Sequence, residues 1–371
     1  MGKSQSVDGT WHKRGHTSHY GVAAVTDVFT GLVVDFEVLS TYCHACACNQ
    51  QLLGDNTRAF QAWYADHSDD CCRNYFGSAN SVEVEAARRL WQRSTEKSGL
   101  KYTSFLTDGD SKAFSAVKDM HPYGPGIEIE KEECINHAHK RMGAALVKQV
   151  QEKKVGGRGV GRMTKEKAHQ FQKYYMYAIV KNKGDIEQMR AAIFATLFHN
   201  ASTDESPHHT RCPAGPSSWC FYKKALARNE APPSHADNIN WPITKDVAQE
   251  LLPVYQRMAD PNLLKRLAKG KTQNANECLH SVIWSKCPKT VFVGKQRLDG
   301  AVASAVSVFN AGATHITQVM ERLGLEVNDL STTIMQAVDN TRIMAARRQS
   351  QRGYRTERKR RADVRLSLIH I

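Results

Sequence analysis

The stretch Tyr20–Leu39, Tyr-Gly-Val-Ala-Ala-Val-Thr-Asp-Val-Phe-Thr-Gly-Leu-Val-Val-Asp-Phe-Glu-Val-Leu, decides which fold we expect for the first part of this chain. β-Branched and other apolar residues fill both halves of the stretch, and Thr30-Gly31 between them favours a turn, so we predict two antiparallel strands. The segment up to Trp11 has the same β character and is separated from the stretch by a turn containing Gly, His and Ser. We therefore expect three consecutive antiparallel strands, the first of which carries Asp8.

Helical and strand patterns alternate after this sheet. Over residues 80–98, apolar residues recur at helical spacing, Ser81 can cap the start of a helix, and Gly99 can end it. The following segments favour, in turn, a strand, a helix, a strand and a basic helix: Tyr102–Thr107, Lys112–Met120, Ile127–Glu133 and His137–Lys153. The resulting order β-β-β-α-β-α-β-α is typical of the α/β RNase H-like fold, a mixed sheet flanked by helices.

Changes in composition divide the chain into parts. A Cys-rich insert with little periodicity occupies residues 41–78, and the stretch from 150 to 270 favours helices around an irregular segment rich in Pro, Cys and His. The expected parts are residues 1–149 as the first part of the RNase H-like core, 150–270 as a large all-helical insertion, 271–325 as the last part of the core with Glu277, and 326–371 as a basic tail.

The charge balance indicates a nucleic-acid partner. The chain has 51 Lys and Arg against 37 Asp and Glu, a formal charge of +14, and such an excess favours association with a polyanion through counterion release. No stretch approaches the roughly 20 apolar residues of a membrane span, and the polar start Met-Gly-Lys-Ser-Gln-Ser is unlike a signal peptide. We expect a soluble intracellular protein without a membrane partner.

Three acidic residues that lie far apart in the sequence are the candidate catalytic groups. Asp8 lies on the first predicted strand, Asp108 follows the apolar end of another, and Glu277 begins a predicted helix. Carboxylate oxygens are preferred ligands of Mg²⁺ or Mn²⁺, and two such ions can activate a water or a 3′-hydroxyl at a phosphodiester. The alternative for each acid alone is a solvated residue or a turn, and the neighbouring Asp110 fits a helix N-cap better than a metal ligand.

Ten cysteines occur mostly in short clusters near histidines. Cys43-x-x-Cys46 followed by His67-x-x-x-Cys71 has ligand types and paired spacings suited to Zn²⁺, which would order an insert with little periodicity. The alternative is a set of reduced cysteines in a loop. The spare candidates are Cys48 and Cys72.

A second, weaker constellation lies in the predicted helical insertion. His209-x-x-Cys212 and Cys220 supply three zinc-ligand types, and a tetrahedral site needs a fourth, for which the sequence offers His208 or His199. The sequence leaves that choice open.

Two basic segments are candidate DNA contacts. Residues 153–162 form a Gly-rich linker in which Lys154, Arg158 and Arg162 can contact phosphates, although a flexible linker is the simpler interpretation. The tail contains a second basic run: Arg358, Lys359, Arg360 and Arg361. Such a run favours DNA backbone binding or nuclear import over a merely solubilising end, and we expect the protein in the nucleus.

Several motifs occur together in an order that resembles Mutator-like element transposases of animals. They are Val7–Trp11 (Val-Asp-Gly-Thr-Trp), Thr107–Ala113 (Thr-Asp-Gly-Asp-Ser-Lys-Ala), Glu133–Gly143 (Glu-Cys-Ile-Asn-His-Ala-His-Lys-Arg-Met-Gly), Gly270–Glu277 (Gly-Lys-Thr-Gln-Asn-Ala-Asn-Glu) and Cys287–Gly294 (Cys-Pro-Lys-Thr-Val-Phe-Val-Gly). The resemblance extends from Ser6 to about Leu325.

This resemblance implies a DDE/D transposase, which cuts double-stranded DNA at transposon ends and joins those ends to a target. It places the catalytic acids on Asp8, Asp108 and Glu277 with two Mg²⁺ or Mn²⁺ ions. The family's Cys-x-x-His signature falls on Cys134 and His137, which we expect to fix the corner between a strand and a helix rather than to bind metal. The alternatives are a transposase-derived DNA-binding protein that has lost catalysis and a nuclease acting on RNA–DNA hybrids.

The sequence also departs from a full transposase of this kind. Seven residues precede Asp8, so we expect this chain to be the catalytic region alone, without an upstream DNA-recognition domain. A transposase must bring two DNA ends together, so a homo-oligomer is a further expectation.

Overall fold

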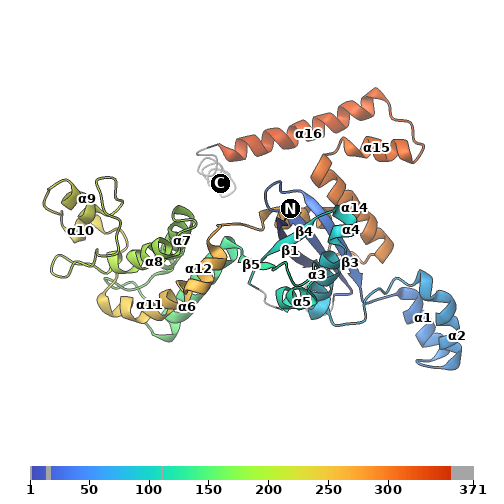
Figure 1. Cartoon of the computed structure of the whole chain (residues 1–371), viewed down its shortest axis with the longest axis horizontal. Helices are drawn as coiled ribbons and strands as arrows, with labels where there is room; N and C mark the ends of the chain where they lie inside the picture. The colour runs from blue at the N-terminus through green and yellow to red at the C-terminus, as the bar shows by residue number, and fades with distance from the viewer. Residues whose placement is uncertain (1, 14–17, 110–111, 352–371) are drawn as a thin grey trace, which may run out of the picture. The chain divides into compact units, whose positions relative to one another are not determined.

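A five-stranded mixed sheet organises the first part of the protein in the computed structural model, which describes residues 2–13, 18–109 and 112–351 (Figure 1). The strands are β1 (Gly2–Trp11), β2 (Tyr20–Asp27), β3 (Val33–Ser40), β4 (Lys101–Thr107) and β5 (Glu130–Glu133). Their order is β3-β2-β1-β4-β5. β2 is antiparallel to β1 and β3, whereas β4 is parallel to β1 and β5. The predicted mixed sheet and its three antiparallel strands are confirmed.

Helices cover one face of this sheet. α3 (Val82–Gln92) packs on β1, β2 and β3 and lies beside α5 (Lys112–Met120), while the short α4 (Ser94–Ser98) follows α3. Trp91 of α3 is fully buried, and its indole N–H donates to the carbonyl of Tyr102 at 3.2 Å, so the largest core side chain is also satisfied as a donor.

The Cys-rich insert contains more structure than its sequence indicates. It forms α1 (His44–Leu53), α2 (Arg58–His67) and a 3₁₀ turn at Ser68–Asp70. No residue of α2 is fully buried, although Phe60, Trp63 and Tyr64 lie on one face and their rings contact one another. The insert is therefore more regular than its weak periodicity predicts. Thr57 caps α2 by accepting a hydrogen bond from the Phe60 N–H at 3.1 Å.

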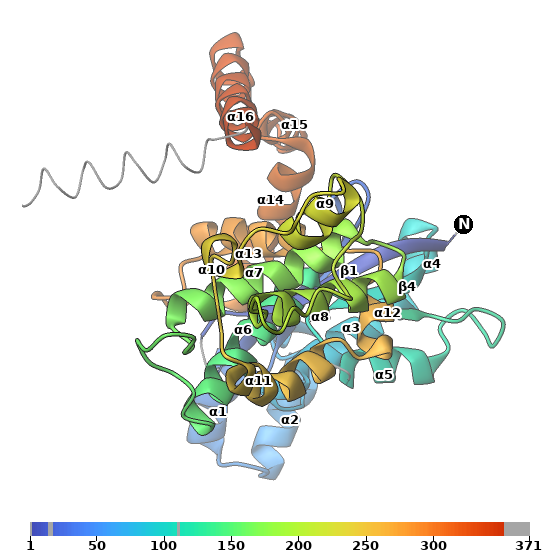
Figure 2. The same cartoon turned by 90° about the vertical axis from the view of Figure 1, so that its left-hand side faces the viewer.

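A second, all-helical core follows the sheet (Figure 2). α6 (Ile135–Glu152), α7 (Lys165–Lys181), α8 (Ile186–Asn200), α11 (Lys245–Met258) and α12 (Pro261–Leu267) pack on one another, and α9 (Phe221–Ala227) and α10 (His235–Asn238) lie in the irregular segment between α8 and α11. Tyr175 is fully buried here, and its hydroxyl donates to the Met258 carbonyl at 3.0 Å.

The chain divides into two compact units, Met1–Glu277 and Cys278–Ile371, and α13 (Asn274–Lys286) runs across the division. The second unit contains α14 (Lys295–Ala311), α15 (His315–Arg322) and α16 (Asp329–Ser350). Asp339 of α16 accepts hydrogen bonds from the backbone N–H groups of Ala313 and Thr314. The expected basic tail is therefore helical up to Ser350.

The basic run Arg358, Lys359, Arg360 and Arg361 lies outside the described residues. In the part that the structure describes, every helix is too short or too polar to traverse a lipid bilayer.

Candidate active site and metal-binding clusters

The parallel pairing of β1 with β4, two adjacent inner strands, places Asp8 and Asp108 side by side toward the C-terminal ends of these strands. Ser6 is the register partner of Leu106, so Asp8 and Asp108 each lie two residues further along adjacent strands that run in the same direction. Side chains alternate along a strand, and Val7 packs in the core under α3, so Asp8 points to the opposite face. Two sequence-distant acids are thus neighbours because of the strand order.

Two amide side chains near Glu277 bond to the sheet and so place Glu277 close to these acids. The Gln273 amide donates to the Val7 carbonyl at 2.8 Å, and the Asn276 amide donates to the Ala24 carbonyl at 2.9 Å. Asn276 also accepts from the Thr26 hydroxyl at 2.6 Å. Because Ala24 is the register partner of Asp8, these bonds fix the first turn of α13 over the strand that carries Asp8.

The three acids repel one another, and this repulsion contributes to a raised pKa of Asp8. Burial raises the pKa of Asp8 to about 7, the Asp108 and Glu277 carboxylates add to the rise by repulsion, and the Gly9 N–H opposes it. Three carboxylates in one place concentrate negative charge, which a divalent cation would neutralise.

His137 lies between the other two acids. Its Nε2 atom is 3.4 Å from a Glu277 oxygen, and its Nδ1 atom is 3.8 Å from an Asp108 oxygen. Cys134 precedes it as the buried residue before α6, and the Cys134 N–H donates to the Thr107 carbonyl at 3.0 Å. The expected structural role thus fits Cys134, whereas His137 contacts the acidic groups directly.

A glycine permits the close approach of a basic residue beside these acids. Gly109 has φ +112°, and a Cβ built on it would lie 3.2 Å from the Arg141 guanidinium. Arg141 is paired with the buried Glu133 at the end of β5. A larger residue at 109 would therefore strain the backbone directly after Asp108. Asp110, the alternative ligand, lies outside the described residues.

The Cys-rich insert gathers four sulfur and nitrogen atoms. Cys43, Cys46, His67 and Cys71 have ligand atoms that all lie within 4.8 Å of one another, with Cys43 Sγ 3.3 Å from His67 Nε2 and Cys46 Sγ 3.5 Å from Cys71 Sγ. Trp63 stacks on the His67 ring at a centroid distance of 4.6 Å. These are the four residues that the sequence selected.

The thiols of this cluster have divergent acidities. Burial would raise the pKa of Cys43, but hydrogen bonds from the Cys46 N–H, the His67 side chain and the Cys72 N–H lower it to about 6. Burial and the neighbouring Cys71 and Cys43 sulfurs raise the pKa of Cys46 to about 12. One sulfur therefore ionises readily, and a bound cation would favour ionisation of the rest. The spare candidate Cys48 contacts His44 instead, at 3.5 Å.

The second cluster combines His199, His209, Cys212 and Cys220, all buried and with ligand atoms within 4.8 Å of one another. His199 Nδ1 is 3.2 Å from His209 Nδ1, which is 3.4 Å from Cys220 Sγ. The structure thus selects His199 as the fourth member. His208 is exposed and contacts the Ser206 hydroxyl at 3.1 Å.

The two Cys/His clusters are tighter than the acidic site. Among the described residues, these two groups are the ones whose ligand atoms all fall within 4.8 Å of one another. The three carboxylates are spread more widely, with His137 between Asp108 and Glu277.

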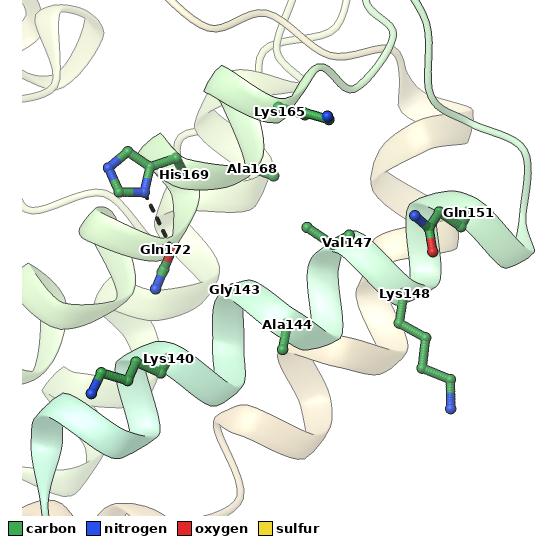
Figure 3. A pocket seen from close by; sticks show the side chains of 10 residues that line it. All are labelled: Lys140, Gly143, Ala144, Val147, Lys148, Gln151, Lys165, Ala168, His169 and Gln172. Carbon is green, nitrogen blue, oxygen red and sulfur yellow. Dashed lines mark hydrogen bonds between the residues drawn. The ribbon is translucent and has the colours of Figure 1, made fainter. Parts of the chain in front are cut away.

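Exposed basic residues border a groove between two helices of the helical core. A groove of about 660 Å³ lies between α6, which begins two residues before His137, and α7. Figure 3 shows the lining residues on the two facing helices, with the Lys140 and Lys148 side chains extending away from α6 and Lys165 at the start of α7. The predicted phosphate contacts Lys154, Arg158 and Arg162 are exposed in the turn region between the same two helices.

Comparison with known proteins agrees with the motifs. No curated protein and no solved structure matches the chain. The family model of the Mutator-like transposases matches residues 3–220, more than half of the chain, and this range includes Asp8, Asp108 and both Cys/His clusters but ends before Glu277. The chain therefore belongs to the Mutator-like transposase family.

Proposed function

We propose that this chain is the catalytic region of a DDE-type DNA transposase with an RNase H-like core, which cleaves DNA at transposon ends and joins them to a target. The observation that carries the proposal is the meeting of Asp8, Asp108 and Glu277 toward the C-terminal ends of β1 and β4, where burial and mutual repulsion raise the pKa of Asp8. Family membership supports the substrate class. A DNA substrate and the basic tail favour a nuclear location.

The acidic residues would hold Mg²⁺ or Mn²⁺. When bound, two such ions lower the pKa of the attacking water or 3′-hydroxyl and neutralise charge on the departing oxygen. Asp8 would supply a partly buried carboxylate from β1, Asp108 one from the end of β4, and Glu277 one from α13. His137 contacts two of the three and holds them in place beside the phosphate.

The test uses the purified chain with DNA duplexes that carry the terminal repeats flanking its genomic reading frame. We expect Mg²⁺- or Mn²⁺-dependent cleavage and joining, both lost in Asp8→Asn and retained in Asp119→Asn, a matched change at an exposed acid. DNA binding without cleavage in either metal would favour the second candidate, a transposase-derived DNA-binding protein. The three carboxylates, unlike the ligand atoms of each Cys/His cluster, do not all lie within 4.8 Å of one another, and this observation favours the alternative.

We also propose that the two Cys/His clusters each bind a structural zinc ion. Four ligand atoms at mutual distances within 4.8 Å, from two thiols and two imidazoles or three thiols and one imidazole, match a closed tetrahedral site without a position for substrate. Atomic absorption on purified protein should find two zinc ions per chain. A metal content that is unchanged in Cys46→Ser and in Cys220→Ser contradicts this assignment.

A further inference from the structure

A chain of polar side chains continues outward from the second cluster. His209 Nε2, on the far side of the ring from the cluster, lies 2.9 Å from His235 Nε2. His235 Nδ1 in turn lies 2.5 Å from an Asp204 carboxylate oxygen. His209 and His235 are both buried. No sequence motif marks Asp204 or His235, because irregular chain separates them from the cluster.

The direction of these hydrogen bonds follows from their last member. An ionised carboxylate only accepts, so the hydrogen of a neutral His235 is on Nδ1, and its Nε2 atom must accept. His209 then carries its hydrogen on Nε2 and donates to His235. This leaves the lone pair on His209 Nδ1, the atom that faces His199 and Cys220. A metal ligand needs that lone pair.

Asp204 is itself held in position. It accepts the His235 backbone N–H at 2.9 Å and the Ser234 hydroxyl at 3.1 Å, in addition to the His235 ring. These bonds tie the segment around α10 to the loop that leads to His209. The local apolar cluster is small, with Ala195, Cys212 and Cys220 buried and Tyr222 packed against them.

We propose that His235 and Asp204 are positioning residues of the second metal centre, which set the tautomer of His209 and couple the α10 segment to ion binding. The inference rests on the zinc proposal above for this cluster. Groups that hydrogen-bond to a ligating histidine orient its ring and raise its basicity, and their loss weakens metal binding about 10- to 100-fold. A packing role alone would leave zinc affinity unchanged.

The experiment measures zinc release from the full chain to a chromogenic chelator, with Cys220→Ser used to identify which release phase belongs to this centre. We expect His235→Ala and Asp204→Asn to weaken zinc retention in that phase about 10- to 100-fold. His235→Gln should recover part of the loss, because the Gln amide can accept from His209 and donate to Asp204. The matched control His208→Ala alters an exposed neighbouring histidine and should behave as wild type.

Two outcomes distinguish the zinc assignment from the positioning role. If Cys220→Ser leaves the zinc content unchanged, the zinc assignment fails. If Cys220→Ser removes one zinc but His235→Ala lowers the melting temperature equally with and without zinc and leaves retention unchanged, the cluster binds zinc and the positioning role is overturned.

Discussion

The acidic site and the second Cys/His cluster differ in solvent accessibility and in the interactions among their charged and polar groups. The acids meet toward the C-terminal ends of β1 and β4 and remain partly accessible, while burial and mutual repulsion raise the pKa of Asp8 to about 7. His199, His209, Cys212 and Cys220 are all buried, and their ligand atoms lie within 4.8 Å of one another. The proposed catalytic role requires a site that is open to DNA and ions, whereas the proposed structural zinc requires a closed site.

The largest effect should come from removing one carboxylate. Asp108→Asn should lower DNA cleavage by roughly a thousandfold or more, because one ligand of the catalytic ions becomes neutral. Gel-based cleavage of terminal-repeat DNA measures it, with Asp119→Asn as the control. Cleavage at the wild-type rate in Asp108→Asn would show that the acidic site is not catalytic.

Removing one thiol tests the closed site. Cys220→Ser should lower the free energy of unfolding by more than about 4 kcal/mol, since loss of a structural metal is among the most severe changes. Circular dichroism on heating, together with zinc content, measures the effect. Cys48→Ser, outside the cluster of the insert, should change neither quantity. Equal stability of the two variants contradicts a structural ion at this centre.

The acidic site should destabilise the protein when no magnesium is present. In the folded state Asp8 keeps its proton up to about pH 7, whereas its ordinary pKa is 3.8, so the folded state binds more protons than the unfolded state between these values. Stability from this group is therefore present at low pH and lost as the pH rises through 7. Linkage gives an upper bound of about 4 kcal/mol for this loss.

The substitution Asp8→Asn should remove this pH-dependent loss of stability. In buffer without magnesium or manganese, the variant should unfold at a higher urea concentration than wild type at pH 8, and the difference should shrink at pH 5. A variant that is equally destabilised at both pH values would indicate that Asp8 is stabilised by its partners rather than strained by them.

The smallest effect concerns the groove between α6 and α7. Replacing Lys140, Lys148 and Lys165 with Gln should reduce the slope of log affinity against log salt for duplex DNA by about 0.9 for each phosphate that these amines neutralise in the wild type. Fluorescence anisotropy at several salt concentrations measures the slope. Lys118→Gln on α5, whose amine is 3.8 Å from Glu128, is the matched control. An unchanged slope in the triple variant places the DNA elsewhere.

Local patterns predict most of the regular elements, because their apolar residues recur with the period of the element that they form. The helix Lys112–Met120 has the predicted bounds, and the strands of the sheet agree within a few residues. α1 and α2 are harder to predict in this way because few of their side chains are buried: Cys46 in α1 and none in α2.

Only part of the candidate site can be predicted from the sequence. The neighbouring positions of Asp8 and Asp108 follow from strand order, but the choice of Glu277 depends on a family resemblance, since its place is set by Asn276 and Gln273 bonding to strands over 250 residues away. His235 and Asp204 carry no sequence signal for the same reason. Their partnership with His209 exists only in three dimensions.

Asn276 bonds to residues about 250 positions earlier in the chain, so the acidic site depends on contacts between early and late parts of the sequence. Asp8 and Asp108 are synthesised long before Glu277, whose position depends on the bonds that its neighbour Asn276 makes to Thr26 and Ala24. A truncated or stalled nascent polypeptide therefore lacks the complete acid set. The proposed acid set is therefore complete only once synthesis has passed roughly three quarters of this chain.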